Sequence, residues 1–448
     1  MSSVIDPTDQ SKVLADDLWA LDARNPRNWP RSKKWAAVSV VSMYTIVAAI
    51  VSSMMAPALP NIAEQFRIVS ETEIALTLSI FLLSFAISPL FYAPLSEMYG
   101  RIWVLHINNM LFVMFNLGCA FAPSKAILLG FRFLCGWAGG APIAIGGGVV
   151  GDVFAAEDRA LAMAIYTLGP VVAPAIGPAI GGFMSETVGW RYLFVFVAGL
   201  SAVASVVGVL LYRETYAPAI RLRFAKEAGD HLLTNLRRPF ILLTRSVICL
   251  TLSGIYYLMF ATFPGLFNDV YHFRTGVSGL AYLGVGIGFS VATAMGGHYG
   301  NKVYHALAAR NGGQGKPEMR VPAILFGAFI VPIGLFWYGW SAEAKIHWIM
   351  PIIGTGIFGF GAMLTFLPIH LYLVDTFTYA ASALSAASVT RSMLAFAFPL
   401  FGTQMFDALG LGPGNSLLAA LAIVMGVPFP IWIWFYGERL RAQSSLTR

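Results

Sequence analysis

The chain has 448 residues, of which 57% are hydrophobic and only 11% are charged, and its formal net charge is +7. Its mean hydropathy is +0.70. A water-soluble fold of this length cannot bury so large an apolar fraction, so the composition excludes a soluble enzyme or binding domain and indicates a membrane protein with several spans.

The first 34 residues are polar, carry five Asp and contain no apolar core, so we expect no cleavable signal peptide. Apolar stretches of about 20 residues, the length that crosses the hydrocarbon core, follow along the rest of the chain. The sequence predicts twelve membrane-spanning helices, near residues 35–58, 74–94, 102–122, 126–150, 160–183, 192–212, 240–263, 277–297, 321–340, 346–374, 384–406 and 415–436.

A basic, polar linker at 213–239 divides these spans six and six. The predicted fold is therefore an all-α polytopic membrane protein with two pseudo-symmetric six-helix bundles, at 35–212 and 240–437, and with cytoplasmic tails at 1–34 and 438–448. Two six-span halves around a central axis are the usual architecture of a secondary transporter with a midplane site.

The distribution of Lys and Arg predicts the orientation of the chain in the membrane. With both termini inside, 21 basic residues lie on the cytoplasmic face and 5 on the opposite face, and Arg132, Arg245 and Arg391 lie at membrane depth. This bias follows the positive-inside rule, so we expect both termini in the cytoplasm. The positive charge lies in short loops beside the spans, and we expect no nucleic-acid partner.

The second span ends in a charged motif at 93–101 that contains Glu97 and Arg101. A carboxylate and a guanidinium four residues apart can pair with each other or with a neighbouring helix terminus. In a rocking transporter such a cluster can close the cytoplasmic side. The alternative is an ordinary interfacial turn whose Arg fixes topology.

Arg132 lies six or seven residues inside the fourth span. An Arg at membrane depth costs about 2.5–3.5 kcal/mol on insertion scales, and intramembrane charges usually mark transport pathways. We therefore expect Arg132 to face the substrate cavity, bonded to polar groups of neighbouring helices. The alternative is that its side chain extends to the outer interface.

Two further motifs concern helix packing and switching. The fifth span carries Gly177, Pro178, Gly181 and Gly182 at near-helical spacing, which predicts a close helix–helix contact, with a gating role as an additional hypothesis. Arg391 in the eleventh span has Asp375, at the cytoplasmic end of the tenth, as a plausible partner. We interpret this pair as switch-related rather than substrate-binding.

The chain resembles the Major Facilitator Superfamily and, within it, the fungal members of the twelve-span drug:proton antiporter family. The matching segments are 25–35, 94–101, 132–140, 177–182, 214–218, 346–351 and 380–384. The resemblance implies the export of drugs, toxins or a secondary metabolite in exchange for protons. It implies a proton gradient as the energy source, no cofactor, and a monomer in the lipid bilayer.

The sequence departs from the family pattern at three points. Ala173 stands where the fifth-span motif has its first Gly, the central linker is short, and no Asp or Glu lies in the middle of a span. A proton-driven antiporter needs a group that titrates during its cycle. The candidates are Glu97, Asp375, Asp407 and His370, whose side-chain type titrates near neutral pH.

Polar and aromatic residues near the midplane are the candidates for the wall of the substrate cavity. They are Tyr44, Ser53, Thr167, Tyr256, Tyr257, Phe260, Phe289, Phe366 and His370. An apolar, aromatic wall with one cation, Arg132, suits amphiphilic, neutral or anionic compounds. The sequence shows no metal-ligand cluster and no nucleophile with a base, so we expect no enzyme. The alternatives are a transporter of small organic acids and a transporter-like sensor that binds without moving its ligand.

Overall fold

The computed structural model describes residue 19, residues 21–155, 158–222, 266–376 and 404–442, and five single positions between 389 and 402. Every regular element within these residues is a helix. Ten helical segments are long and apolar enough to cross a membrane, and they correspond to ten of the twelve predicted spans. The predicted seventh span and most of the eleventh lie outside the described residues.

Consecutive helices build the first six spans. They are α2 (Arg31–Met54), α3 (Leu59–Phe66), α4 (Glu71–Ile87), α5 (Pro89–Tyr99), α6 (Arg101–Ala120), α7 (Lys125–Val153), α8 (Arg159–Thr187) and α9 (Arg191–Leu211), followed by α10 (Ala217–Leu222). The second span consists of α4 and α5, because Pro89 has no N–H and begins a new helical segment after Ser88. Ser70 and Ser124 cap α4 and α7 by accepting hydrogen bonds from the backbone N–H three residues later.

The second half of the described chain has the same construction. Its elements are η3 (Leu266–Val270), α13 (Thr275–Leu280), α14 (Leu283–Arg310), η4 (Pro317–Arg320), α15 (Val321–Glu343), α16 (Ile349–Thr376), α18 (Leu411–Gly426) and α19 (Pro428–Ala442). The last span consists of α18 and α19, which are separated at Val427 just before Pro428.

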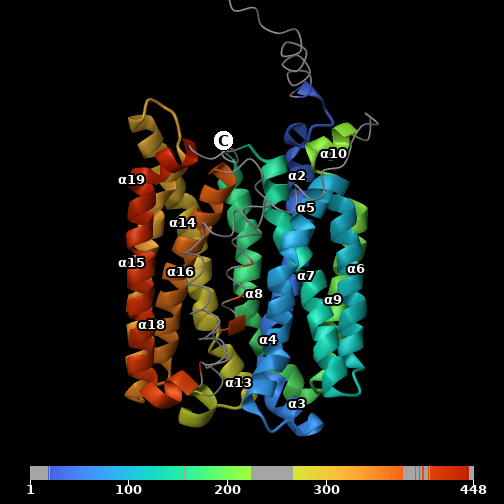
Figure 1. Cartoon of the computed structure of the whole chain (residues 1–448), viewed down its shortest axis with the longest axis vertical. Helices are drawn as coiled ribbons and strands as arrows, with labels where there is room; N and C mark the ends of the chain where they lie inside the picture. The colour runs from blue at the N-terminus through green and yellow to red at the C-terminus, as the bar shows by residue number, and fades with distance from the viewer. Residues whose placement is uncertain are drawn as a thin grey trace, which may run out of the picture.

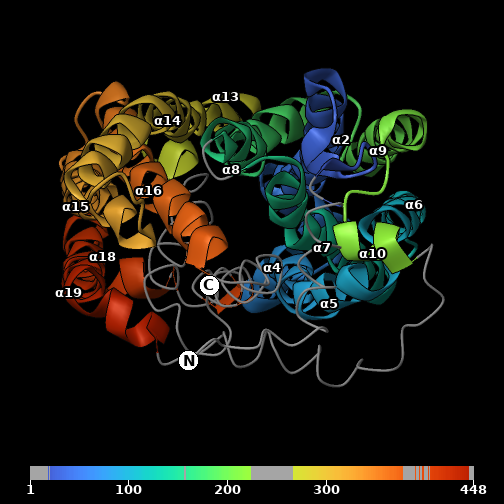
Figure 2. The ribbon, with the colours of Figure 1, turned by 90° about the horizontal axis from the view of Figure 1, so that it is seen from above.

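The helices form two bundles that lie side by side (Figure 1). In the first, α6 packs against α7 and α9, α4 against α7, and α2 against α8. In the second, α14 and α15 pack against α16, and α15 also packs against α18. The bundles meet where α8 contacts α13 and α14, as Figure 2 shows from above.

The outer surface of both bundles is apolar. Met114 on α6, Val206 on α9, Phe326 on α15 and Val424 on α18 each expose 60–67% of their surface. Water would oppose the exposure of so many large apolar groups, whereas the hydrocarbon of a bilayer does not. The outward-facing sides of the bundles are therefore the lipid-facing surface.

The start of α2, α10 and the end of α19 all lie at one end of the molecule, at the top of Figure 1. We call this the termini end. Several charged side chains gather there, at the ends of the spans.

Candidate functional site

A single glycine joins the second and third spans at the termini end. α5 ends at Tyr99, α6 begins at Arg101, and Gly100 between them has φ +92°. Glycine is favoured in this conformation because it has no Cβ. A Cβ at this position would also collide with the carboxylate of Glu214, which fills the space beside the turn.

Glu214 caps the N-terminus of α6. Its Oε1 accepts a hydrogen bond from the backbone N–H of Arg101 at 2.9 Å, and its Oε2 accepts one from that of Ile102 at 3.2 Å. A carboxylate in this position satisfies N–H groups that have no partner within the helix, and it interacts favourably with the positive end of the helix dipole. The segment after α9 is thereby attached to the link between the second and third spans.

The Arg101 side chain extends from this link to the end of α7. Its Nε donates to Oδ2 of Asp152 at 2.9 Å, and its Nη1 donates to Oγ of Ser96 at 3.0 Å. The guanidinium also stacks on the ring of Tyr216, 4.9 Å from the ring centroid. The structure shows Arg101 bonded to a neighbouring helix terminus, which is one of the arrangements that the motif at 93–101 predicted.

Asp375 bridges two arginines and joins the two bundles. Its Oδ1 accepts from Nη1 of Arg159 at 3.3 Å, and its Oδ2 accepts from Nε of Arg320 at 2.8 Å. The three side chains expose only 12%, 3% and 7% of their surface, respectively. Because Arg159 begins α8 and Asp375 lies near the end of α16, their contact is an ion pair between the bundles. We call Arg159–Asp375 the inter-bundle ion pair.

This arrangement adds two residues to the sequence-based site. The expected partner of Asp375, Arg391, lies outside the described residues, whereas Arg159 and Arg320 were expected only to contribute to the topology signal. One signal could have identified them: each lies at the N-terminal end of a span, where the helix dipole disfavours a cation. A cation in this position therefore needs a specific hydrogen-bond acceptor that stabilises it. Arg159 has acceptors besides Asp375, since it also donates to the carbonyls of Gly151 and Phe154 at the end of α7.

Arg132 is enclosed within the first bundle. Its guanidinium donates to the main-chain carbonyls of Thr77 and Leu78 on α4 and of Val51 on α2, at 3.1–3.4 Å. It also stacks 4.8 Å from the ring centroid of Phe81. The hydrogen bonds to neighbouring helices are as expected, but the expected cavity-facing position is wrong because none of the side chain is exposed. Full enclosure also rules out extension to the outer interface. Its role in coupling stays a prediction.

The glycine–proline motif of the fifth span lies at two helix contacts at once. A Cβ on Gly177 would come within 2.6 Å of Oγ of Ser53 on α2, and a Cβ on Gly181 would collide with the carbonyl of Met54 on the same helix. On another side of α8, the carbonyl of Pro178 lies 2.6 Å from the Cβ that Gly279 of α13 lacks. Gly182 is buried as well. The predicted close packing is present, both within the first bundle and between the bundles.

The candidate cavity residues of the first bundle do not form one surface. Tyr44 is buried and its hydroxyl pairs with Nδ1 of His106 on α6 at 3.0 Å, so it is directed into the first bundle, against the expectation. Ser53 is directed toward α8, where it lies against Gly177. Thr167 is buried and donates to the carbonyl of Met163 on its own helix. The direction of each side chain depends on helix rotation, which hydropathy does not encode.

The candidates of the second bundle lie closer to the interface. Phe289 is buried in a hydrophobic cluster that contains residues of both bundles. Phe366 packs against the same cluster, and its ring centroid lies 3.9 Å from that of His370 one turn later on α16. Tyr256, Tyr257 and Phe260 lie outside the described residues.

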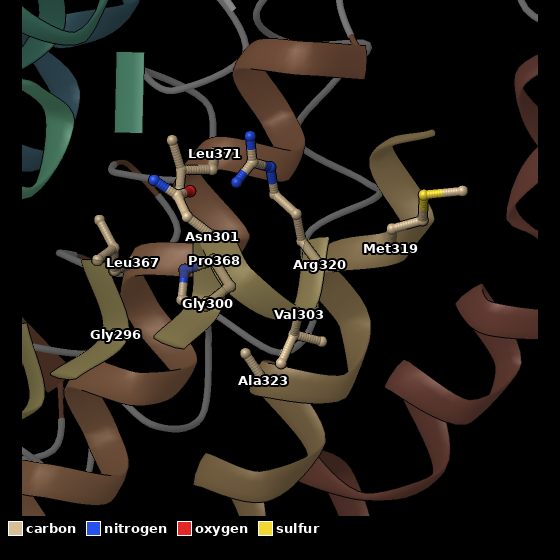
Figure 3. A pocket seen from close by; sticks show the side chains of 10 residues that line it. All are labelled: Gly296, Gly300, Asn301, Val303, Met319, Arg320, Ala323, Leu367, Pro368 and Leu371. Atoms are coloured by element: carbon tan, nitrogen blue, oxygen red, sulfur yellow. The ribbon is translucent and has the colours of Figure 1, made fainter. Parts of the chain in front are cut away.

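A small cavity lies beside the inter-bundle ion pair, within the second bundle (Figure 3). α14, η4, α15 and α16 line it. Arg320, the second cation bonded to Asp375, contributes to its wall together with Asn301, Leu367 and Leu371.

Comparison with known proteins identifies the family. The Major Facilitator Superfamily model matches residues 41–399. The chain is 42% identical to the efflux pump vrtL of Penicillium aethiopicum, over 95% of this chain and 89% of that protein. It is 39% identical to the efflux pump radE of Floropilus chiversii, over 94% and 83%. It is 40% identical to the MFS transporter cpaT of Aspergillus oryzae, over 94% and 90%.

Solved structures agree with this assignment at the level of the fold. The proton:xylose symporter XylE superposes with a TM-score of 0.68 at 15% identity, covering 91% of this chain and 96% of that one. The human organic anion transporter MFSD10 superposes with a TM-score of 0.64 at 16% identity, covering 91% and 100%. Membrane-spanning bundles, a charged termini end and relatives along nearly the whole chain lead to one conclusion: this protein is a membrane transporter, not an enzyme, and it belongs to the Major Facilitator Superfamily.

Proposed function

We propose that this transporter exports amphipathic small molecules, such as drugs, toxins or a secondary metabolite, in exchange for protons and by alternating access. The observation that carries the proposal is its 39–42% identity, across nearly the whole chain, to fungal proteins named efflux pumps. Transporters built from two repeats typically bind substrate near the midplane and rock one bundle against the other. The two bundles of this chain supply the elements that such a cycle requires.

In this proposal the inter-bundle ion pair holds the termini end closed. Arg159 and Asp375 belong to different bundles, so any rocking that separates the bundles at this end must break their contact. Arg320 and Asp375 belong to one bundle, as do Arg101 and Asp152, and these pairs move as units. Among the ion pairs of the described residues, the Arg159–Asp375 contact is therefore the lock at this end, and it can open while the charged clusters within each bundle stay intact.

Protonation of Asp375 is a direct way to couple this lock to a proton gradient. A neutral carboxyl group attracts Arg159 much less than a carboxylate does. Proton binding would therefore favour opening at the termini end, and proton release would favour closure. His370, less than two turns before Asp375 on α16, is the second candidate, because imidazole titrates near neutral pH. Glu97 and Asp407 remain further candidates.

The surroundings of Arg132 favour neutral amphiphiles over small organic acids. Its guanidinium donates to three carbonyls and is fully enclosed, so a substrate carboxylate does not reach it. Phe289 and Phe366, which lie near the interface, present aromatic surface. Aromatic and apolar walls with few polar groups suit large, mostly apolar ligands.

We further propose that the termini end faces the cytoplasm, that the protein works in the plasma membrane, and that one chain suffices for transport. The orientation is supported by the excess of Lys and Arg in the loops predicted at that end. Epitope tags next to Ser11 and Leu446 test it. We expect antibody labelling only after the cells are permeabilised, and labelling of intact cells would refute the orientation.

Flux into proteoliposomes tests transport itself. The purified protein is reconstituted and given either a pH gradient or none, with a panel of fluorescent amphiphiles and small carboxylic acids as probes. We expect gradient-dependent movement of amphiphiles that a protonophore abolishes. Flux of acids alone would favour an organic-acid transporter, binding without flux would favour a sensor, and flux that ignores the pH gradient would refute proton antiport. Metabolite profiles of cells with and without the protein then identify the substrate.

A further inference from the structure

The cavity beside Arg320 is not used by the proposed transport cycle. In Figure 3 the Arg320 guanidinium and the Asn301 amide extend toward the same side of it, whereas Val303 and Ala323 line the opposite side. Leu367 and the other lining groups of α16 are apolar. The cavity therefore has two polar groups, those of Arg320 and Asn301, in an otherwise mostly apolar lining, with Leu371 beside them.

The protein provides hydrogen-bond acceptors for only part of the Arg320 guanidinium. Its Nε donates to Asp375, and one face of its guanidinium lies 4.6 Å from the ring centroid of Tyr304. Among the described residues its two terminal nitrogens donate no hydrogen bond, although the residue is only 8% exposed. Neither terminal nitrogen is among the buried side-chain atoms that lack a partner, so both are accessible to solvent and can donate to a ligand.

The balance of charges around Arg320 also favours an anionic ligand. One carboxylate, that of Asp375, offers one oxygen to Arg320 and the other to Arg159. Exposed Lys302 and Arg310, on the last three turns of α14, add positive potential at this end of the bundle. The planar fork of a guanidinium matches a phosphate or a carboxylate, to which it can donate two parallel hydrogen bonds.

We propose that this cavity binds the anionic head of an amphiphile, a phosphate or carboxylate group held by the terminal nitrogens of Arg320 and by the Asn301 amide. The apolar part of the ligand would lie along Leu367 and Val303, which is 43% exposed. The headgroup of an anionic lipid fits this description best, since basic groups near the membrane surface attract anionic lipids. Free phosphate would accept the same hydrogen bonds, and the experiment below distinguishes an anionic lipid from the free ion.

Gly300 lies in the wall of the cavity and can take a larger side chain without disturbing the helix contacts. A Cβ at Gly300 would meet no atom within 4 Å, so Gly300→Leu places its side chain in open space next to Asn301. The matched control is Gly199→Leu on α9, where a Cβ also meets nothing within 4 Å and the surface faces lipid. Asn301→Leu removes a polar group of the site as a second, independent change.

The test is native mass spectrometry of the full-length protein with phosphatidic acid or, for comparison, phosphatidylcholine, together with thermal shifts in inorganic phosphate. We expect phosphatidic acid to bind at least about tenfold more tightly than phosphatidylcholine. Gly300→Leu and Asn301→Leu should each weaken that binding about tenfold, and Gly199→Leu should leave it unchanged. If phosphate stabilises the parent but not Gly300→Leu, and phosphatidic acid binds no better than phosphatidylcholine, the ligand is a soluble anion in the same site.

Equal binding of both lipids without a phosphate effect would overturn the proposal. So would phosphatidic acid binding that survives in both variants. A folding defect is separated from a loss of binding by the melting temperatures of Gly300→Leu and Gly199→Leu, which should agree. None of these measurements requires a transported substrate, so their outcome is independent of the proposed efflux function.

Discussion

Replacing Asp375 with Asn should open the termini end, because it removes the carboxylate that Arg159 contacts across the bundle interface. The Asp375–Arg320 contact lies within one bundle and is present whether that end is open or closed. It therefore contributes equally to the free energies of the open and closed states. Within the part of the chain that the structure describes, what remains between the bundles is one hydrogen bond between charged groups, at 3.3 Å and with both side chains largely buried. Such a bond contributes about 1.5–3 kcal/mol. At about 1.4 kcal/mol per tenfold change, Asp375→Asn should shift the populations toward the open termini end by about 10- to 100-fold.

Distances between two nitroxide labels measure this shift. The labels are placed at Lys33, in the first turn of α2, and at Arg310, at the end of α14, both exposed and on different bundles. The native cysteines are replaced by Ser. We expect pulsed electron spin resonance to show a longer distance in Asp375→Asn than in the parent.

The matched control is Glu438→Gln, which removes the exposed ion pair between Glu438 and Lys316 within the second bundle. Exposed pairs contribute about 0–1 kcal/mol, and this one does not cross the interface, so its distance distribution should match the parent. If Asp375→Asn and the parent give the same distribution, the inter-bundle ion pair does not hold the termini end closed.

Three further substitutions test the packing and the site. Gly181→Ala places a methyl group against a main-chain carbonyl of α2, so the apparent melting temperature in detergent should fall by the equivalent of about 1–3 kcal/mol. Gly199→Ala, which meets no neighbour, should leave that temperature unchanged, and equal values for both would contradict the close contact between Gly181 and α2. Arg132→Lys keeps the charge but loses the fork that reaches carbonyls on two helices, so both the melting temperature and gradient-driven flux should fall, and normal flux would refute a role in coupling. Gly100→Ala forces a Cβ into a φ of +92° and against the Glu214 carboxylate, so the melting temperature should again fall; an unchanged value would contradict the close contact between this turn and Glu214.

The sequence by itself determined the class and the architecture. Membrane-spanning length and Lys/Arg bias are properties of short, contiguous segments, and the bilayer acts on each segment separately, so they can be identified without knowing which helices touch. The same holds for the tight contact at Gly177 and Gly181, because small residues at helical spacing permit close approach whatever helix lies opposite. The family motifs were recognisable for the same reason.

Only the tertiary structure decided in which direction individual side chains point and which partners they contact. The sequence shows that Arg132 lies at membrane depth, but its acceptors lie on α2 and α4, more than fifty residues away along the chain. The partners of Asp375 on other elements were likewise missed, because pairing between distant segments depends on helix rotation and on the register of one helix against another. Tyr44 is directed toward His106 for the same reason. Hydropathy and charge place a residue along the membrane normal, whereas packing decides which way around the helix axis it points.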